Sequence, residues 1–135
     1  MTMLSKNTVA TAALVGLLGM AVASPVRADI KDYEFQLVQG ELKKGDGAIV
    51  AVRLMNKKTS KPVSDAVIFA KRIDMAPDGM ATMDSPLEAL PSTEPGVYRF
   101  KTNLMMAGRW QLSLGAKVQG ETGTVESKLV LKALP

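Results

Sequence analysis

The sequence of 135 residues contains no cysteine and no histidine. The absence of cysteine excludes disulfides, thiolate catalysis and zinc sites built on cysteine. A nucleophilic enzyme would then need a serine or threonine activated by a lysine or a carboxylate, and no such pairing stands out. We therefore expect a protein that is not an enzyme, and a hydrolase is the weaker alternative.

Other binding motifs are also missing. No glycine-rich phosphate cradle follows a strand and opens a helix. Acidic residues precede Gly79, but their spacing is not that of a calcium loop. We expect the carboxylates of this stretch to be solvated; they are Asp74, Asp78, Asp84 and Glu88.

The one long apolar run lies at the N-terminus. Lys6 precedes it, residues 8–23 are apolar and uncharged, and small residues follow up to Ala28. This layout predicts a secretory signal peptide of residues 1–28, cleaved to leave an exported domain of residues 29–135 without a stable membrane anchor. The alternative is a membrane anchor, because the run approaches the length of a short transmembrane helix.

The charge of the exported part is nearly balanced. The whole chain has 17 basic and 13 acidic residues, and removal of Lys6 and Arg27 leaves 15 against 13, a net charge of +2. Several lysines lie in turns beside acidic residues, which is typical of a solvated surface. We expect no nucleic-acid partner.

Six segments show the alternation of apolar and polar residues that is typical of half-buried strands. They are residues 32–39, 47–56, 64–73, 96–104, 109–118 and 124–133. The segment 109–118 is the clearest, with Trp110 and Leu112 predicted to face inward and Gln111 outward. The segment 64–73 is apolar on both faces at its centre, which predicts an inner strand.

These segments predict an all-β domain, a small antiparallel immunoglobulin-like β-sandwich of about 6–7 strands. A closed barrel is the alternative. Residues 105–108 are expected to join two strands as a hairpin. Residues 74–95 contain four prolines and are expected to form a long irregular loop, a class of loop that is often functional.

Methionine is the informative residue of the exported part, which contains six. Met55 ends a strand and is expected to pack in the core. The other five fall in two connections: Met75, Met80, Met83, Met105 and Met106. A thioether is a soft, neutral donor that suits Cu(I) and is a poor ligand for zinc or magnesium.

The two methionine clusters can form one site only if the strands that precede them end at the same pole of the sandwich. The bland alternatives are that the methionines fill gaps in the core or form a protein-contact patch. Trp110 is expected to anchor the core, and its alternative role is to cover a bound cation with its ring face.

The succession of Met75, Met80 and Met83, the segment PGVYRF (95–100) and the segment LMMAGRWQL (104–112) resembles the YtkA-like/FixH-like family. The segment KPVSDAV (61–67) is similar to the family's turn and strand. The resemblance covers about residues 33–131. The sequence departs from the family where Ala76-Pro77 and Met106-Ala107 stand in place of Met-Pro.

The resemblance implies a periplasmic immunoglobulin-like module that is linked to copper handling and to heavy-metal efflux. We expect a periplasmic protein that holds or transfers Cu(I) through Met80, Met83, Met105 and Met106, with Met75 as a spare ligand and Trp110 as a cover. The alternative is a metal-free accessory module that docks on the periplasmic adaptor of an efflux pump or on another periplasmic partner.

Overall fold

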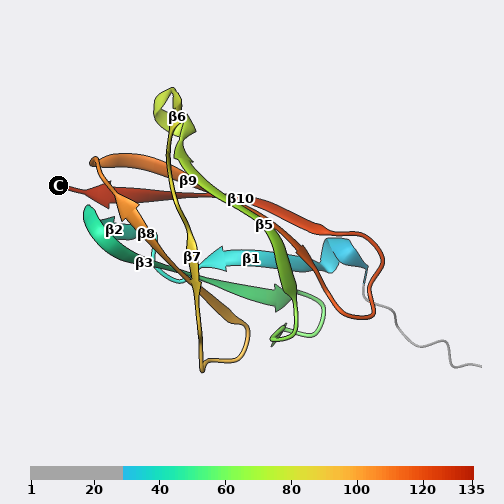
Figure 1. Cartoon of the computed structure of the whole chain (residues 1–135). Helices are drawn as coiled ribbons and strands as arrows, with labels where there is room; N and C mark the ends of the chain where they lie inside the picture. Colours follow the sequence, from blue (N-terminus) through green and yellow to red (C-terminus); the bar gives the residue numbers. More distant parts are fainter. Residues whose placement is uncertain (1–28) are drawn as a thin grey trace, which may run out of the picture.

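The computed structural model describes residues 29–135, which form ten strands and two short 3-10 helices. The strands lie in two sheets that pack face to face as a β-sandwich (Figure 1). The predicted all-β sandwich is therefore confirmed. The predicted signal peptide of residues 1–28 lies outside the described residues.

The first sheet has the order β1-β3-β8-β7, with β4 also paired to β3, and all its pairs are antiparallel. Its strands are β1 (Tyr33–Leu37), β3 (Gly45–Asn56), β4 (Lys61–Pro62), β7 (Glu88–Leu90) and β8 (Val97–Leu104). The 3-10 helix η2 (Ile30–Asp32) precedes β1.

The second sheet has the order β2-β10-β9-β5-β6, and its pairs are antiparallel except that β2 runs parallel to β10. Its strands are β2 (Glu41–Lys43), β5 (Val67–Met75), β6 (Met80–Ser85), β9 (Gly108–Lys117) and β10 (Val125–Leu134). The 3-10 helix η3 (Ala76–Asp78) lies between β5 and β6. In the described part of the chain, no helix is long and apolar enough to cross a membrane.

The core lies between the sheets and follows from period-two alternation, because successive side chains of a strand point to opposite faces. On β9, Trp110, Leu112 and Leu114 are buried, whereas Gln111 and Ser113 are only half-buried. The facing sheet contributes buried side chains from β1, β3 and β8: Phe35, Val50, Val52, Leu54, Phe100 and Leu104. All six strands predicted from the sequence are present, as β1, β3, β5, β8, β9 and β10.

Two expectations about connections were wrong. Residues 105–107 are not a hairpin turn within one sheet, because β8 belongs to the first sheet and β9 to the second. Residues 74–95 are not one irregular loop, because they contain η3, β6 and β7. These short elements show little alternation of apolar and polar residues, and the four prolines of this stretch therefore led to the prediction of a loop.

Residues 64–73 were expected to form an inner strand, and the sheet order does place β5 between β9 and β6. β5 pairs with β9 along its length but with β6 only from Ile73 to Met75. Val67 and Phe69 are 62% and 54% exposed. Most of β5 is therefore a sheet edge, and apolar residues on both faces do not distinguish an edge from an interior strand.

Candidate functional site

The five candidate methionines lie on segments that meet at one end of the sandwich. β5 runs antiparallel to β9 with Asp74 opposite Gln111, so the last residue of β5 lies beside the first residues of β9. The turn of residues 105–107 leads from β8 into β9. β5 and β8 therefore end at the same pole, and the geometric condition for a shared site is met. We call residues 75–83 and 104–109 the methionine end.

A clamp between Asp78 and Arg109 fastens η3 to β9. The Asp78 carboxylate accepts a hydrogen bond from the backbone N–H of Arg109 and another from its Nε, each at 2.8 Å. The Arg109 Nη2 also donates to the carbonyl of Pro77 at 2.7 Å. The hydrogen bond from the Arg109 backbone, followed by that from its side chain, lowers the pKa of Asp78 below its ordinary value. The two methionine-bearing connections are thus tied to each other.

Gly108 allows this close approach. Its φ is +142°, and a Cβ placed on it would lie 2.6 Å from Asp78 Oδ2 and 2.8 Å from Met75 Cε. Residues other than glycine rarely adopt this φ, and a Cβ atom this close to Asp78 and Met75 would force the neighbouring atoms to move. The missing side chain makes room for both the clamp and the Met75 methyl group.

Met75 itself belongs to the core. It is fully buried, and its burial stabilises the fold by about 1.5–3 kcal/mol, the usual range for an apolar side chain of its size. A metal could reach its sulfur only if the side chain left the core. Met80 is half-buried and packs against the core cluster.

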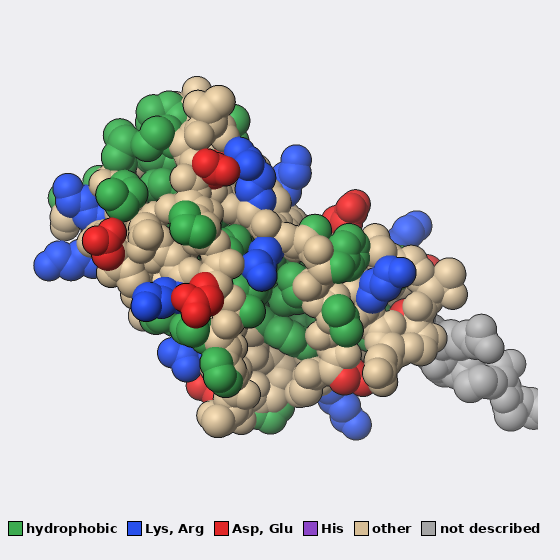
Figure 2. All heavy atoms as spheres, in the orientation of Figure 1, with side chains coloured by type: hydrophobic (Ala, Val, Ile, Leu, Met, Phe, Trp, Pro, Cys, Tyr) green, Lys and Arg blue, Asp and Glu red, His purple; other side chains and the backbone are tan. Residues whose placement is uncertain are grey.

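The other three methionines are exposed to solvent. The exposed fractions are 36% for Met83, 60% for Met105 and 39% for Met106. Figure 2 shows hydrophobic side chains gathered over the end of the molecule where η3 and the turn between β8 and β9 lie in Figure 1. Exposed apolar side chains that gather in one patch, unlike scattered ones, often mark a binding surface.

One hydrogen bond between β6 and β8 determines where Met83 lies relative to Met105 along the strand direction. The hydroxyl of Ser85 donates to the backbone carbonyl of Asn103, so β6 passes close to β8. Met83 lies two residues before Ser85 and Met105 two residues after Asn103, in both cases towards the methionine end. Two strand residues span about 6.6 Å, so the backbones of Met83 and Met105 lie at similar distances from this shared contact.

Trp110 holds the turn from the core side. Its ring is 1% exposed, and its indole N–H donates to the carbonyl of Met106, with Nε1 and O 3.0 Å apart. The structure therefore places Trp110 in the core next to the turn backbone. This bond fixes the backbone from which Met106 projects.

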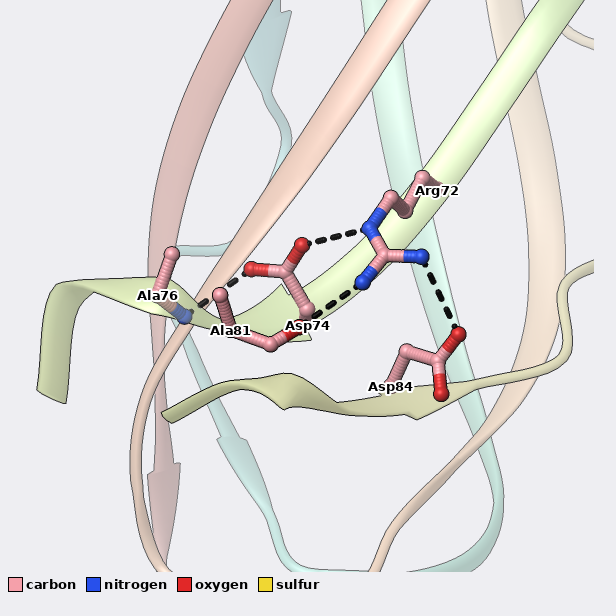
Figure 3. A network of polar contacts seen from close by, with 5 residues as sticks. All are labelled: Arg72, Asp74, Ala76, Ala81 and Asp84. Carbon is pink, nitrogen blue, oxygen red and sulfur yellow. Dashed lines mark hydrogen bonds and ion pairs between the residues drawn. The ribbon is translucent and has the colours of Figure 1, made fainter. Parts of the chain in front are cut away.

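A second arginine fastens β6 (Figure 3). Arg72 donates from Nε to Asp74 at 2.7 Å, from Nη1 to Asp84 at 3.1 Å and from Nη2 to the carbonyl of Ala81 at 2.7 Å. The other oxygen of Asp74 accepts from the backbone N–H of Ala76 at 2.9 Å. The hydrogen bond to Asp74 is the main reason that the pKa of Arg72 is raised. The network ties the end of β5 to β6, the strand that carries Met80 and Met83.

This network corrects the expectation that the carboxylates of residues 74–84 are simply solvated. Asp74 is 5% exposed and paired, and Asp78 and Asp84 are each bonded to an arginine. The signal in the sequence was the alternation of Arg72 with Asp74, two residues apart on one strand face. The partnership of Asp78 with Arg109 spans 31 residues and has no local signal.

The donors at the methionine end favour a soft metal over a hard one. Within residues 29–135, no group of three or more histidine, cysteine, aspartate or glutamate residues is arranged to hold a metal ion. The three nearby aspartates are engaged by Arg72 and Arg109. Three of the exposed side chains at this end are thioethers, Met83, Met105 and Met106, whose chemistry fits Cu(I).

Comparisons with known proteins place the chain in a family. The model of the family described as "YtkA-like" matches residues 27–115. A solved structure titled "ZirS C-terminal Domain" is similar over 93% of this chain and 88% of that one, at 13% sequence identity and a TM-score of 0.42. A similarity of this level says nothing about function or partners. No protein of curated function matches the chain significantly. The match over residues 27–115 covers most of the sequence, and the chain belongs to the YtkA-like family.

Proposed function

We propose that this protein is a periplasmic, non-enzymatic copper protein that holds or transfers Cu(I) through the thioethers of the methionine end, in support of heavy-metal efflux. Met80, Met83, Met105 and Met106 are the proposed ligands. The observation that carries the proposal is that exposed thioethers of two distant segments share one end of the sandwich while the neighbouring carboxylates are engaged by arginines.

The chemistry of the compartment supports this choice of donor. A thioether binds without losing a proton and cannot form a disulfide, so it remains available where thiols are oxidised. The bound ion would be Cu(I), a soft monovalent cation that the protein would hold or pass on. The protein's own contribution is to hold the two connections together through Asp78, Arg109 and Trp110.

The test is a Cu(I) titration against a competing chelator. A variant with Met80, Met83, Met105 and Met106 changed to leucine keeps the apolar volume and removes the sulfurs. We expect its Cu(I) affinity to fall by more than about tenfold, or 1.4 kcal/mol. The matched control is Met55→Leu, because Met55 is half-buried near the opposite end of β3 and should not affect the affinity. An affinity that is indifferent to the four changes rejects the proposal.

The second candidate is a metal-free module that docks its methionine end on an efflux adaptor or another periplasmic partner. The 60% exposure of Met105 within a gathered apolar surface favours it. Leucine preserves an apolar contact, whereas a charge destroys it. Docking should therefore survive Met105→Leu and fail in Met105→Glu, while a thioether site should fail in both.

A further inference from the structure

Residues 67–72 of β5 form an unpaired sheet edge, which we call the β5 edge. β9 pairs with β5 on one side, but β6 pairs on the other side only from Ile73 onward. After β6 the chain leaves for β7 in the other sheet (Figure 1). Five of these six residues are exposed, and only Ile68 is half-buried. Such an edge presents main-chain N–H and C=O groups to which another strand can pair.

A hollow lies on each side of the β5 edge. The register places Ala70 and Arg72 opposite Gly115 and Ser113 on the outer face, where β5, β9 and β10 line a groove of 520 Å³. Ile68 and Lys71 line a second hollow of 210 Å³ between β5 and the strands β7 and β8. An added strand would point alternate side chains to the two faces. The two hollows therefore lie on the two faces of the sheet towards which alternate residues of one extended segment would point.

The charges around these hollows are mostly positive. Their lining contains four cationic side chains and one anionic side chain, Glu126; the cations are Lys71, Arg72, Arg99 and Lys128. Arg72 is paired with Asp74 and Asp84, but Lys71, Arg99 and Lys128 form no ion pair within residues 29–135. Complementary charge selects partners at an interface, so the β5 edge favours an acidic segment.

Two features disfavour a second copy of this chain as the occupant. Lys71 stands opposite Leu114, so it lies on the core-facing side of an edge strand, and the register shift around Phe69 adds a residue to the edge. An inward-pointing charge and a bulge are devices that prevent flat self-pairing of edges. Two copies would also bring two unpaired Lys71 side chains together.

We propose that the β5 edge binds an extended acidic segment of a partner protein by strand addition, with alternate side chains of that segment in the two hollows. The main-chain hydrogen bonds of the new strand supply affinity, and Lys71, Arg99 and Lys128 select acidic side chains. The inference depends on β5 and its neighbours and not on the methionines.

The test uses nuclear magnetic resonance of the isotope-labelled protein with a short probe peptide of alternating Glu and Val. We expect the peptide to shift the amide resonances of residues 67–72 at about 1 mM or below, the range of weak complexes. The double variant Lys71→Glu, Lys128→Glu should weaken binding by more than about tenfold. The control Lys57→Glu changes an exposed lysine in a turn and should have no effect.

Two further probes separate strand addition from simple charge attraction. The same peptide N-methylated at alternate residues keeps its charge but loses main-chain donors, and it should no longer bind. A Lys-Val peptide should not bind either. Equal binding of either probe, or no shift at residues 67–72, overturns the proposal. Shifts that follow protein concentration alone would assign the edge to a second copy and overturn it as well.

Discussion

Individual side chains at the methionine end are held by charge and by close packing. Asp78 bridges to Arg109, Asp74 and Asp84 share Arg72, and Trp110 binds the carbonyl of Met106. Ion pairs on a solvated surface contribute little, but several that converge on one loop restrict its motion. The methionine-bearing segments are therefore held in place by the arginine–aspartate contacts and by Trp110.

Gly108 offers a direct test of the close approach. Gly108→Ala introduces both a strained φ and contacts with Asp78 and Met75, so we expect it to lower the free energy of unfolding by about 2–4 kcal/mol. Gly45→Ala is the matched control, because Gly45 has the same φ, +142°, but nothing lies within 4 Å of an added Cβ. Urea unfolding of both variants measures the difference. An equal loss of unfolding free energy in the two variants would show that the contacts with Asp78 and Met75 do not contribute to the effect.

The clamp at Asp78 predicts a dependence on pH. Its pKa is lower in the folded protein than in the unfolded chain, where it is about 4, so its stabilising effect is complete above that value. The effect is lost as the pH falls through the folded pKa. We expect Asp78→Asn to be less stable than the unaltered protein at pH 7 and to show a smaller drop in urea midpoint below pH 4. The exposed residue Asp46 provides the control Asp46→Asn, and identical pH profiles for Asp78→Asn and the unaltered protein would contradict the assignment.

At the scale of the elements, the long strands followed from the sequence and the short ones did not. β9 alternates without interruption and was predicted almost to the residue, because its inner face packs on a complete opposing sheet. β6 lacks such alternation, with four of its six residues exposed, and is held by three residue pairs and by Arg72. A strand that depends on a distant arginine has no local signature.

The same reasoning explains what could be predicted of the candidate site. The sequence identified both methionine clusters and the condition for their meeting, because strand direction follows from a small number of topologies. It did not separate the buried Met75 from the exposed Met105, because β5 continues as far as Met75 and places that residue in the core. The clamp between Asp78 and Arg109 joins residues 31 positions apart, so no local pattern in the sequence predicts it.

β6 should loosen when Arg72 is removed. In Arg72→Met the carbonyl of Ala81 and the carboxylate of Asp84 lose their shared donor, so we expect faster amide hydrogen exchange in residues 80–85. Exchange in β10 should be unchanged. Lys132→Met serves as a control, because Lys132 is an exposed residue of β10 outside the network. Unchanged exchange in β6 would show that its three backbone pairs suffice.

At the scale of the whole molecule, the sandwich separates two surfaces. One end gathers thioethers from two connections, and the side of the second sheet presents the basic β5 edge. Both depend on β5, which reaches the methionine end at Met75 and leaves residues 67–72 unpaired. The proposed Cu(I) site and the proposed strand-pairing surface would thus share one strand of the same sheet.

The central claim is that the thioethers of the methionine end bind Cu(I). The most direct measurement is nuclear magnetic resonance of protein labelled on the methionine methyl groups during titration with Cu(I). We predict that the methyl signals of Met80, Met83, Met105 and Met106 shift together and saturate, while those of Met55 and the buried Met75 remain in place. Signals that do not move, or that all move alike without saturation, would contradict the claim.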